Sequence, residues 1–516
     1  MTTLADALRT AAERTPDRVL VIDAGVRLDA ATLQRKAAVL AQALGERMPP
    51  GSVVSFMLPN WHEAAVIYLA ATLAGMVVNP ILPSLRDREL GFILDDAAVR
   101  MLFVPAEFGG HDYVAMARRV TGRLAAPPEV VVLRGEPGPF RALRDLVPAD
   151  TRPTPQRLDP DAPRMILYTS GTTGRPKAVL HSDATIAALI GQIGAHWRVE
   201  PGDTFLVPSP IAHIGGSIYA FECPLLLGST AVLMSRWDPD TAVALMLEHR
   251  CTHMAGATPF LEHLLAAARR AGTRLPDLKV FICGGASVPP ALIRSATDYF
   301  ERAAVSRVYG STEVPVTTVG ALDDPDAAAD TDGRPGIARV RIAPHPAAPA
   351  GTGEIEVRGP QRMLRYARDE DTAAAITDDG WFRTGDLGRF NDDGYLVVTG
   401  RAKDIIIRHG ENISPKEVED VLAGHPDIAE VAVVGLPDPR TGERACAVIV
   451  PAAGRPGPDL AELRRYLAAA GVARFKTPEQ VEIWQALPKS DAGKVLKHRI
   501  RAALLGDGIE DGGLCR

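Results

Sequence analysis

Residues 165–182, MILYTSGTTGRPKAVLHS, combine side-chain types that could hold the oxygens of a triphosphate. An apolar run, a Ser/Thr/Gly stretch and a second apolar run predict a strand, a loop and a return strand. Glycine lets the backbone approach a bulky anion, hydroxyls and amides donate hydrogen bonds, and a lysine adds positive charge. The segment is not a Walker loop, because the Gly-Lys-Ser/Thr ending is missing. A simple Gly/Thr-rich turn between two strands is the alternative interpretation. The candidate ligands are Thr169, Ser170, Gly171, Thr172, Thr173, Gly174 and Lys177.

A second segment, YGSTE at residues 309–313, follows another predicted strand. An aromatic face suits adenine, a glycine allows close approach, hydroxyls suit phosphate, and a carboxylate suits Mg²⁺, which prefers oxygen ligands. A Tyr-Gly turn with a solvated glutamate is the alternative interpretation. The candidate nucleotide-binding residues are Tyr309, Gly310, Ser311, Thr312 and Glu313, with Glu313 also the candidate metal ligand.

Asp386 lies in an Arg-Thr-Gly-Asp segment, fifteen residues before Arg401. A carboxylate accepts hydrogen bonds well from a pair of ribose hydroxyls, and an arginine could bind ribose or phosphate. Both residues could equally form an ion pair on the surface.

The elements that must position these residues follow a regular pattern from residue 31 to about 310. Short β-rich runs alternate with Ala/Leu-rich stretches of helical periodicity, which predicts an α/β architecture with mostly parallel sheets. Ligands of such sheets bind beyond the carboxyl ends of the strands, where the candidate segments lie. After residue 320 the pattern changes to loops and antiparallel strands, and the last 110 or so residues predict a small α+β unit. The predicted domains are residues 1–402 and 403–516.

Length, charge and cysteine content restrict the class of protein. A chain of 516 residues exceeds what one hydrophobic core usually supports. A net charge of −6, from 57 basic and 63 acidic residues, gives no electrostatic footprint for nucleic acid. The five cysteines form no CxxC pair and show no zinc-ligand spacing, which fits a reducing cytoplasm.

Neither the N-terminus nor any apolar run predicts a membrane segment. The first twenty residues alternate Ala and Leu with charges, which indicates an amphipathic helix rather than a signal peptide. The longest apolar stretch, Ala64 to Val78, is shorter than the roughly 20 residues that span a bilayer. We expect it to form a buried helix.

Six motifs in one order resemble the adenylate-forming enzymes, a superfamily of acyl-CoA synthetases, luciferases and peptide-synthetase adenylation domains. The resemblance covers nearly the whole chain and looks closest to bacterial medium-chain and cyclic-carboxylate CoA ligases. It implies a large N-terminal domain of parallel-rich α/β sheets with a small distorted β-barrel, followed by a small mobile α+β domain. The motifs are the loop at 165–182, PSPIAHIGG at 208, ICGGA at 282, YGSTE at 309, WFRTGDLG at 381 with GRAKDIII at 400, and PKSDAGKVLK at 488.

The resemblance also implies roles for individual residues. Lys494 would be the catalytic lysine, with a solvated tail lysine as the alternative. His213 would lie at the wall of the acyl pocket, with a satisfied core histidine as the alternative. Lys403 would be the hinge between the domains. The residues implied to line adenine are Gly284, Gly285 and Ala286.

The chain departs from the family pattern at two informative places. Related sequences have a histidine where this chain has Asp183. A Gly-Gly-Glu-Asn segment of CoA ligases, whose first glycine borders the pantetheine passage, reads His409-Gly410-Glu411-Asn412 here. The imidazole of His409 therefore bears on whether CoA is the acceptor.

The sequence as a whole predicts an ATP-dependent carboxylate–CoA ligase that uses Mg²⁺ and acts on a largely hydrophobic acid. One alternative keeps the adenylation but passes the activated group to a carrier-protein thiol, an amine or nitrite. Another is a nucleotide-binding regulator without catalysis, against which Lys494, Glu313 and Asp386 argue.

Overall fold

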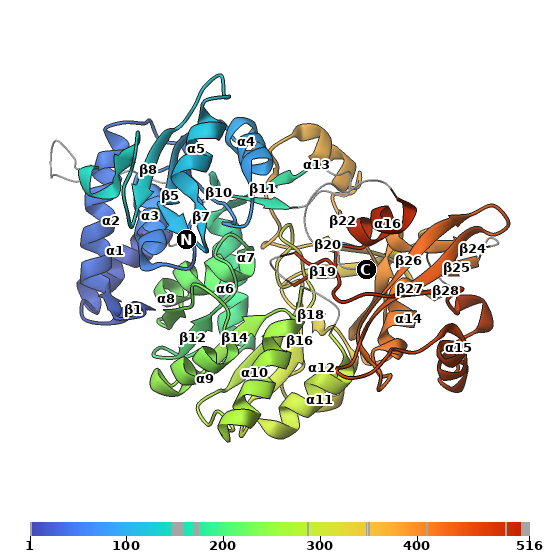
Figure 1. Ribbon diagram of the computed structural model, residues 1–516. Coiled ribbons are helices and arrows are strands. Elements are labelled where there is room, and N and C mark those ends of the chain that lie inside the picture. Colours follow the sequence, from blue (N-terminus) through green and yellow to red (C-terminus); the bar gives the residue numbers. More distant parts are fainter. Residues whose placement is uncertain are drawn as a thin grey trace.

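The computed structural model describes residues 3–146, 159–169, 175–285, 288–346, 348, 351–408, 411–490 and 493–506. These residues form a large N-terminal domain built on two wide sheets and a small C-terminal domain beside it (Figure 1). The predicted two-domain α/β fold is therefore confirmed. No helix in the described part of the chain is long and apolar enough to cross a membrane.

The first large sheet has seven strands in the order β16-β15-β14-β12-β13-β1-β2. All neighbours are parallel except β1 and β2. The strands of its parallel part are short and mostly buried, as expected when helices cover both faces. They are β1 Val19–Asp23, β2 Val26–Asp29, β12 Thr204–Val207, β13 Thr230–Leu233, β14 His253–Gly256, β15 Val280–Cys283 and β16 Ala304–Arg307.

The second large sheet has eight strands in the order β21-β11-β10-β4-β3-β5-β8-β9. It is parallel from β10 to β9, while β11 and β21 are antiparallel to their neighbours. The strands are β3 Val53–Phe56, β4 Val77–Pro80, β5 Val99–Pro105, β8 Glu129–Leu133, β9 Arg141–Ala142, β10 Pro163–Thr169, β11 Lys177–Ser182 and β21 Arg365–Tyr366.

The connecting helices of the large domain carry clear start and stop signals. Thr3 and Asp6 form a capping box at the start of α1, and Gly272 ends α10 in the left-handed conformation. The helices are α1 Leu4–Arg14, α2 Ala30–Gly45, α3 His62–Leu73, α4 Asp87–Asp96, α5 Tyr113–Thr121, α6 Asp183–His196, α7 Ile214–Ser217, α8 Cys223–Leu226, α9 Pro239–Glu248, α10 Thr258–Ala271, α11 Pro290–Tyr299, α12 Pro325–Asp330 and α13 Asp369–Ala375, with a 3₁₀ turn at Leu143–Asp145 and a π-helical turn at Ile218–Glu222.

The prediction of one buried helix from Ala64 to Val78 is wrong in its second part. The helix α3 ends at Leu73, and Val77 and Val78 begin the buried strand β4. Gly75, at φ +68°, makes the turn between them. A uniformly apolar run has no periodicity that separates a buried helix from a buried strand.

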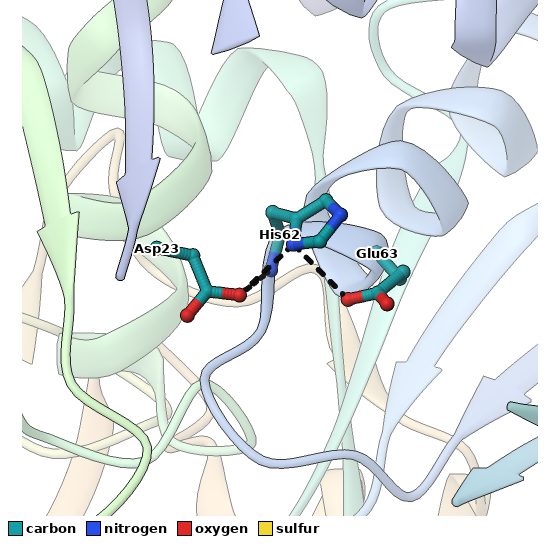
Figure 2. A group of neighbouring side chains, drawn as sticks. All are labelled: Asp23, His62 and Glu63. Atoms are coloured by element: carbon teal, nitrogen blue, oxygen red, sulfur yellow. Dashed lines mark hydrogen bonds and ion pairs between the residues drawn. The ribbon is translucent and has the colours of Figure 1, made fainter. Parts of the chain in front are cut away.

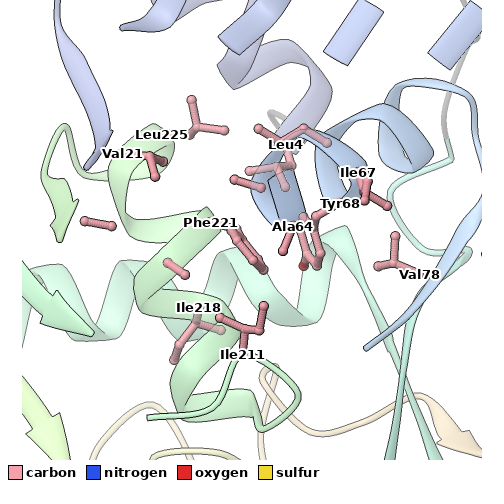
Figure 3. Packing of buried hydrophobic residues seen from close by; sticks show 14 of the residues in the cluster. Leu4, Val21, Ala64, Ile67, Tyr68, Val78, Ile211, Ile218, Phe221 and Leu225 are labelled. Atoms are coloured by element: carbon pink, nitrogen blue, oxygen red, sulfur yellow. The ribbon is translucent and has the colours of Figure 1, made fainter. Parts of the chain in front are cut away.

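The main core of the large domain joins segments that are far apart in sequence. Figure 3 shows Leu4 of α1, Tyr68 of α3, Val78 of β4 and Phe221 of the π-helical turn in one cluster. Each of these side chains is almost completely buried. The N-terminal helix is thus part of the core, and the predicted amphipathic helix is confirmed.

A third, smaller part of the large domain is antiparallel. Four strands pair in the order β19-β20-β22-β23, and a two-stranded ribbon, β17-β18, precedes them. The bounds are β17 Thr318–Val319, β18 Arg334–Pro335, β19 Arg339–Ala343, β20 Gly353–Arg358, β22 Phe382–Phe390 and β23 Leu396–Arg401, while the hairpin β6 Glu107–Phe108 with β7 His111–Asp112 pairs apart from the large sheets.

The small domain follows a 3₁₀ turn at Ala402–Asp404. A sheet in the order β25-β24-β27-β26, with β28 added parallel to β27, is accompanied by three helices. The Ser414 hydroxyl donates to the Thr399 carbonyl, a contact between the two domains. The bounds are β24 Ile406–Arg408, β25 Glu411–Ile413, α14 Pro415–Leu422, β26 Ile428–Asp438, β27 Gly442–Pro451, α15 Leu460–Ala469, a 3₁₀ turn at Arg474–Lys476, β28 Gln480–Ile483 and α16 Lys497–Leu505.

Candidate functional site

The predicted strand, loop and return strand around the Ser/Thr/Gly segment are present. β10 ends at Thr169 and β11 begins at Lys177, and these two residues are direct partners in the antiparallel pair. Both ends of the loop are therefore held side by side. The loop residues proposed as phosphate ligands, Ser170, Gly171, Thr172, Thr173 and Gly174, lie outside the described residues.

Two cations after this loop share a carboxylate that the sequence analysis missed. Asp371 of α13 accepts from Arg175 Nη2 and from Lys177 Nζ, each at 3.0 Å. The ammonium of Lys177 also lies 5.0 Å from the centre of the Tyr366 ring. The only sequence signal was the acidic run at 369–371, which is nearly 200 residues from the loop.

The same tyrosine contacts the candidate metal ligand. Tyr366 OH donates to Glu313 Oε1 at 2.8 Å, and the Met363 amide donates to the Glu313 carbonyl at 2.7 Å. Burial and the Glu313 charge raise the pKa of Tyr366, so the phenol keeps the proton that it donates. Glu313 is thus held in place through Oε1 and its backbone carbonyl.

Thr312 is positioned through its backbone by a buried histidine. His181 Nε2 lies 2.8 Å from the Thr312 carbonyl, which can only accept, so this nitrogen carries the proton. Desolvation lowers the pKa of His181 to about 4, partly opposed by this hydrogen bond. The imidazole is therefore neutral at pH 7, and its Nδ1 lies 3.1 Å from the Thr185 hydroxyl.

The turn at residues 309–317 requires its glycine. A Cβ on Gly310 would lie 2.6 Å from the Val316 amide nitrogen, which is too close for any other residue. Within the turn, Ser311 Oγ accepts from the Val314 amide at 3.2 Å. The hydroxyl predicted to face phosphate at Ser311 therefore already has a structural contact.

Asp386, Arg401 and Tyr309 form one hydrogen-bonded group. Tyr309 OH donates to Asp386 Oδ2 at 2.8 Å, and Arg401 Nε lies 2.9 Å from Asp386 Oδ1. Asp386 and Arg401 are direct partners on β22 and β23. The ion pair left open by the sequence does form, but Asp386 is 6% exposed and so is not a surface residue.

Lys494 of the small domain lies near enough to this group for its charges to act on the ammonium. Lys494 as a whole residue is exposed, but protein surrounds its ammonium group. Desolvation, followed by the charge of Arg401, lowers the pKa of Lys494 to about 8. The Asp386 charge acts in the opposite direction. The neighbouring Gly493, at φ +78°, packs on the start of α10, where a Cβ would lie 3.1 Å from Pro259 Cγ. Lys494 and Asp386, which are 108 positions apart in the sequence, thus lie near enough for their charges to interact.

The glycines implied to line adenine follow β15. A Cβ on Gly284 would lie 2.9 Å from the Val308 carbonyl oxygen, and Gly285 has a φ of +80°. Both positions favour glycine for backbone reasons alone. Ala286 lies outside the described residues.

His213 lies in the loop between β12 and α7, at the cap position of α7. Asn60, which the sequence analysis missed, fixes this loop. Asn60 Nδ2 donates to the carbonyls of Val207 and Ser209 at 3.0 and 2.9 Å, and its Oδ1 accepts from the Ile211 amide at 3.1 Å. A single asparagine between a buried strand and a helix gave no sequence signal for contacts about 150 residues away.

The residues between the domains are described only in part. Lys403 lies exposed in the 3₁₀ turn between β23 and β24, and its role as a hinge stays a prediction. The proposed residues of the thioester passage, His409 and Gly410, lie outside the described residues.

A second polar cluster lies at the ends of β1 and α3 (Figure 2). His62 Nδ1 is 2.9 Å from Asp23 Oδ2 and 3.3 Å from Glu63 Oε2, a set of groups that could ligate a metal. Arg134 Nη2 contacts the same two oxygens at 3.1 and 2.6 Å, and its guanidinium stacks 3.8 Å from the centre of a Trp61 ring. Because the guanidinium already supplies the positive charge, we interpret the cluster as an ion-pair network that ties these segments together.

Comparison with known proteins gives consistent results over the whole chain. Residues 8–367 match the model of the AMP-binding enzyme family, and residues 417–494 match its C-terminal domain. A medium-chain fatty-acid–CoA ligase of Escherichia coli is 34% identical over 97% of this chain and 90% of its own length. A salicyl-AMP ligase / salicyl-S-ArCP synthetase of Mycobacterium tuberculosis is 35% identical over 96% of this chain and 90% of its own.

A solved structure supports the same conclusion about the fold. An amide bond synthetase from Marinactinospora thermotolerans superposes with a TM-score of 0.84 at 29% identity, covering 97% of this chain and 99% of that chain.

Proposed function

The chain belongs to the family of AMP-binding enzymes, and from that premise we propose that it is an ATP-dependent carboxylate–CoA ligase. The observation that carries the proposal is the hydrogen-bonded group of Asp386, Arg401 and Tyr309 in the large domain, whose charges act on Lys494 of the small domain. A ribose-binding carboxylate and a mobile cation close together are what adenylate formation needs.

In the first half-reaction, an oxygen of the substrate carboxylate forms a bond to the α-phosphorus of ATP and pyrophosphate leaves. Negative charge builds up between the acyl oxygen and the phosphate, and the ammonium of Lys494 would stabilise it there. Asp386 would accept from the ribose hydroxyls, and Lys177, Thr172 and Thr173 would contact the departing phosphates.

The residues present fit a magnesium ion bound with ATP. Glu313 offers one carboxylate whose Oε1 is fixed by Tyr366, and Mg²⁺ commonly takes one or two carboxylates together with phosphate oxygens. The ion would supply positive charge at the phosphates. Glu313 would hold it, and His181 would keep the backbone of Thr312 in place.

In the second half-reaction, the thiol of CoA adds to the acyl carbonyl, loses its proton, and AMP leaves. We propose that residues 403–516 rotate about Lys403 between the two steps, which withdraws Lys494 and brings the segment of His409 and Gly410 to the adenylate. The exposed position of Lys403 between β23 and β24 supports this boundary.

We propose a largely hydrophobic carboxylic acid as the substrate. The loop of His213 is followed by Ile214 and two glycines, and the turn after Tyr309 contains Val314 and Val316. The Escherichia coli relative is named for medium-chain fatty acids, which agrees with an apolar pocket.

A second candidate keeps the adenylation and changes the acceptor. One relative is named as a synthetase that loads a carrier protein, and a structural neighbour is named as an amide bond synthetase. His409, in place of the glycine of CoA ligases, is the residue of this chain that favours such an acceptor.

The test is release of pyrophosphate and AMP across a panel of carboxylic acids, with and without CoA. The proposal expects AMP release that depends on both an apolar acid and CoA. AMP release that requires a carrier protein or an amine instead would favour the second candidate, and no pyrophosphate exchange with any acid would contradict adenylation itself.

The two half-reactions can be separated in one variant. Lys494→Ala should lose about 10² to 10³ in the rate of adenylate formation, because one stabilising cation is removed from the transition state. The same variant should still convert supplied acyl-adenylate and CoA to thioester. Lys489→Ala is a matched control, since that lysine pairs with Glu430 of the small domain at 2.7 Å. Equal loss of both half-reactions in Lys494→Ala would contradict the assignment.

A further inference from the structure

The proposed phosphate-binding lysine does not stand free in the described structure. Lys177 Nζ and Arg175 Nη2 both lie 3.0 Å from Asp371, one on each carboxylate oxygen. The side chains of Lys177 and Asp371 are only 17% and 14% exposed, so water weakens this pair less than a surface pair. The Asp371 carboxylate thus fixes the distance between Arg175 and Lys177, which both follow the Ser/Thr/Gly loop.

The pair is connected to the candidate metal ligand. Lys177 lies over the ring of Tyr366 at 5.0 Å from its centre, and the hydroxyl of Tyr366 donates to Glu313. These contacts run from Asp371 through Lys177 and Tyr366 to Glu313, and they join three separate segments of the chain. A shift of the Lys177 ammonium would therefore change the positive charge beside both the phosphates of bound ATP and the proposed magnesium ion.

Other contacts already hold α13 in place. Arg368, directly before α13, pairs with Asp96 of α4, and Tyr168 donates to the same carboxylate at 2.9 Å. Inside the segment, the Tyr366 amide donates to Thr372 Oγ1 at 3.0 Å. The ion pairs of Asp371 are thus not needed to attach the helix, and their main effect is on Arg175 and Lys177.

We propose that Asp371 is a positioning residue for nucleotide binding, which holds Lys177 and Arg175 where they meet the triphosphate of ATP. The inference rests on the proposed adenylation and adds a residue to it. Without the carboxylate, two flexible side chains of like charge separate, and binding must order them again.

The test compares Asp371→Asn with Glu370→Gln in the full chain. The asparagine keeps the size of the side chain and removes its charge. Glu370 is a matched control because it is 73% exposed and lies 3.5 Å from Arg175. We expect Asp371→Asn to raise KM for MgATP in pyrophosphate exchange about five- to tenfold, with KM for the acid and the thioester step from supplied acyl-adenylate unchanged. Glu370→Gln should resemble the wild type.

Two further variants separate positioning from stability. Asp371→Glu should recover part of the loss, because it restores the charge. Asp371→Asn added to the variant that carries both Lys177→Ala and Arg175→Ala should make it no worse, because Asp371 acts through these two cations. Additive effects would overturn the proposal, as would an equal rise of both KM values with a lower melting temperature.

The remaining outcomes are also decisive. A lower KM for MgATP would show that Asp371 competes with the phosphates, and an unchanged KM would show that it does nothing for binding. If the wild-type chain exchanges no pyrophosphate, the proposed function has failed. If it does and Asp371→Asn is normal, only the positioning role has failed.

Discussion

At the scale of single residues, the surroundings of Lys494 lower the proton affinity of its ammonium, although part of the residue is exposed. The ammonium of Lys494 lies near Arg401, and desolvation together with this like charge lowers its pKa to about 8. The nearby carboxylate of Asp386 prevents a larger shift. The protonated form is the one that can stabilise the charge of adenylation, so the rate of that step should depend on pH.

We predict that kcat/KM for pyrophosphate exchange falls as pH rises through about 8. The pKa is lowered, so the ammonium is complete below this pH and is lost above it, whereas an unperturbed lysine would stay charged until about 10.4. The profile is measured from pH 6.5 to 9.5 at low substrate.

Lys494→Arg is the control for this profile, because a guanidinium stays charged over the whole range. Its activity should be lower but flat with pH in the alkaline limb. The same decline in this variant would assign the titration to another group.

At the scale of elements, the connection between β12 and α7 depends on one buried side chain. Asn60 bonds to three backbone groups of the loop at residues 207–211. The loop also packs tightly against α7, since a Cβ on Gly216 would lie 2.0 Å from the Pro210 carbonyl oxygen. His213 therefore has a fixed place relative to β12, as its proposed role at the wall of an acid-binding pocket requires.

We predict that Asn60→Asp raises KM for the acid about tenfold and leaves KM for MgATP unchanged. The substitution places a carboxylate oxygen against two carbonyl oxygens, which costs about 1–3 kcal/mol of free energy in the positioning of the loop. Pyrophosphate exchange at varied acid and varied MgATP separates the two constants.

Asn79→Asp is a matched control. Asn79 is also fully buried and donates to the Ile166 carbonyl at 3.1 Å, but it lies within the second large sheet. It should lower the melting temperature without changing the ratio of the two KM values. The same selective effect on the acid in both variants would contradict the role of Asn60, and Asn60→Ser serves if the aspartate variant does not fold.

At the scale of the whole molecule, a buried charge network holds the parts of the large domain together. Arg164 of β10 lies 2.9 Å from Asp183 Oδ1 and 2.8 Å from Glu222 Oε1, and it donates to Tyr68 OH at 2.9 Å. Asp183 also accepts from the Leu4 amide at 3.2 Å, which fixes the start of α1. The aspartate that departs from the family pattern is therefore a structural residue.

We predict that Arg164→Met destabilises the chain by about 3–5 kcal/mol, because it leaves two buried carboxylates without their cation. The midpoint of denaturant unfolding measures the effect. Arg141→Met, which breaks an exposed pair with Glu129, should cost no more than about 1 kcal/mol. Equal midpoints for the two variants would contradict the role of the network.

The sequence was most informative about structure where a strand or helix has a local pattern of residue types. Strands and helices with clear periodicity, such as α1 and β10 with β11, could be predicted because their pattern lies within a few residues. The run from Ala64 to Val78 could not, because a buried helix and a buried strand are both uniformly apolar.

The sequence by itself determined the α/β class and the order of the motifs, and it predicted candidate residues for ATP chemistry, such as Asp386 and Lys494. Only the tertiary structure decided which of them meet and what holds them. Asp371, Asn60 and His181 each act on a segment more than a hundred residues away, through one ion pair or hydrogen bond. Such a contact leaves no periodicity or spacing in the chain, because it depends on how whole sheets and helices pack.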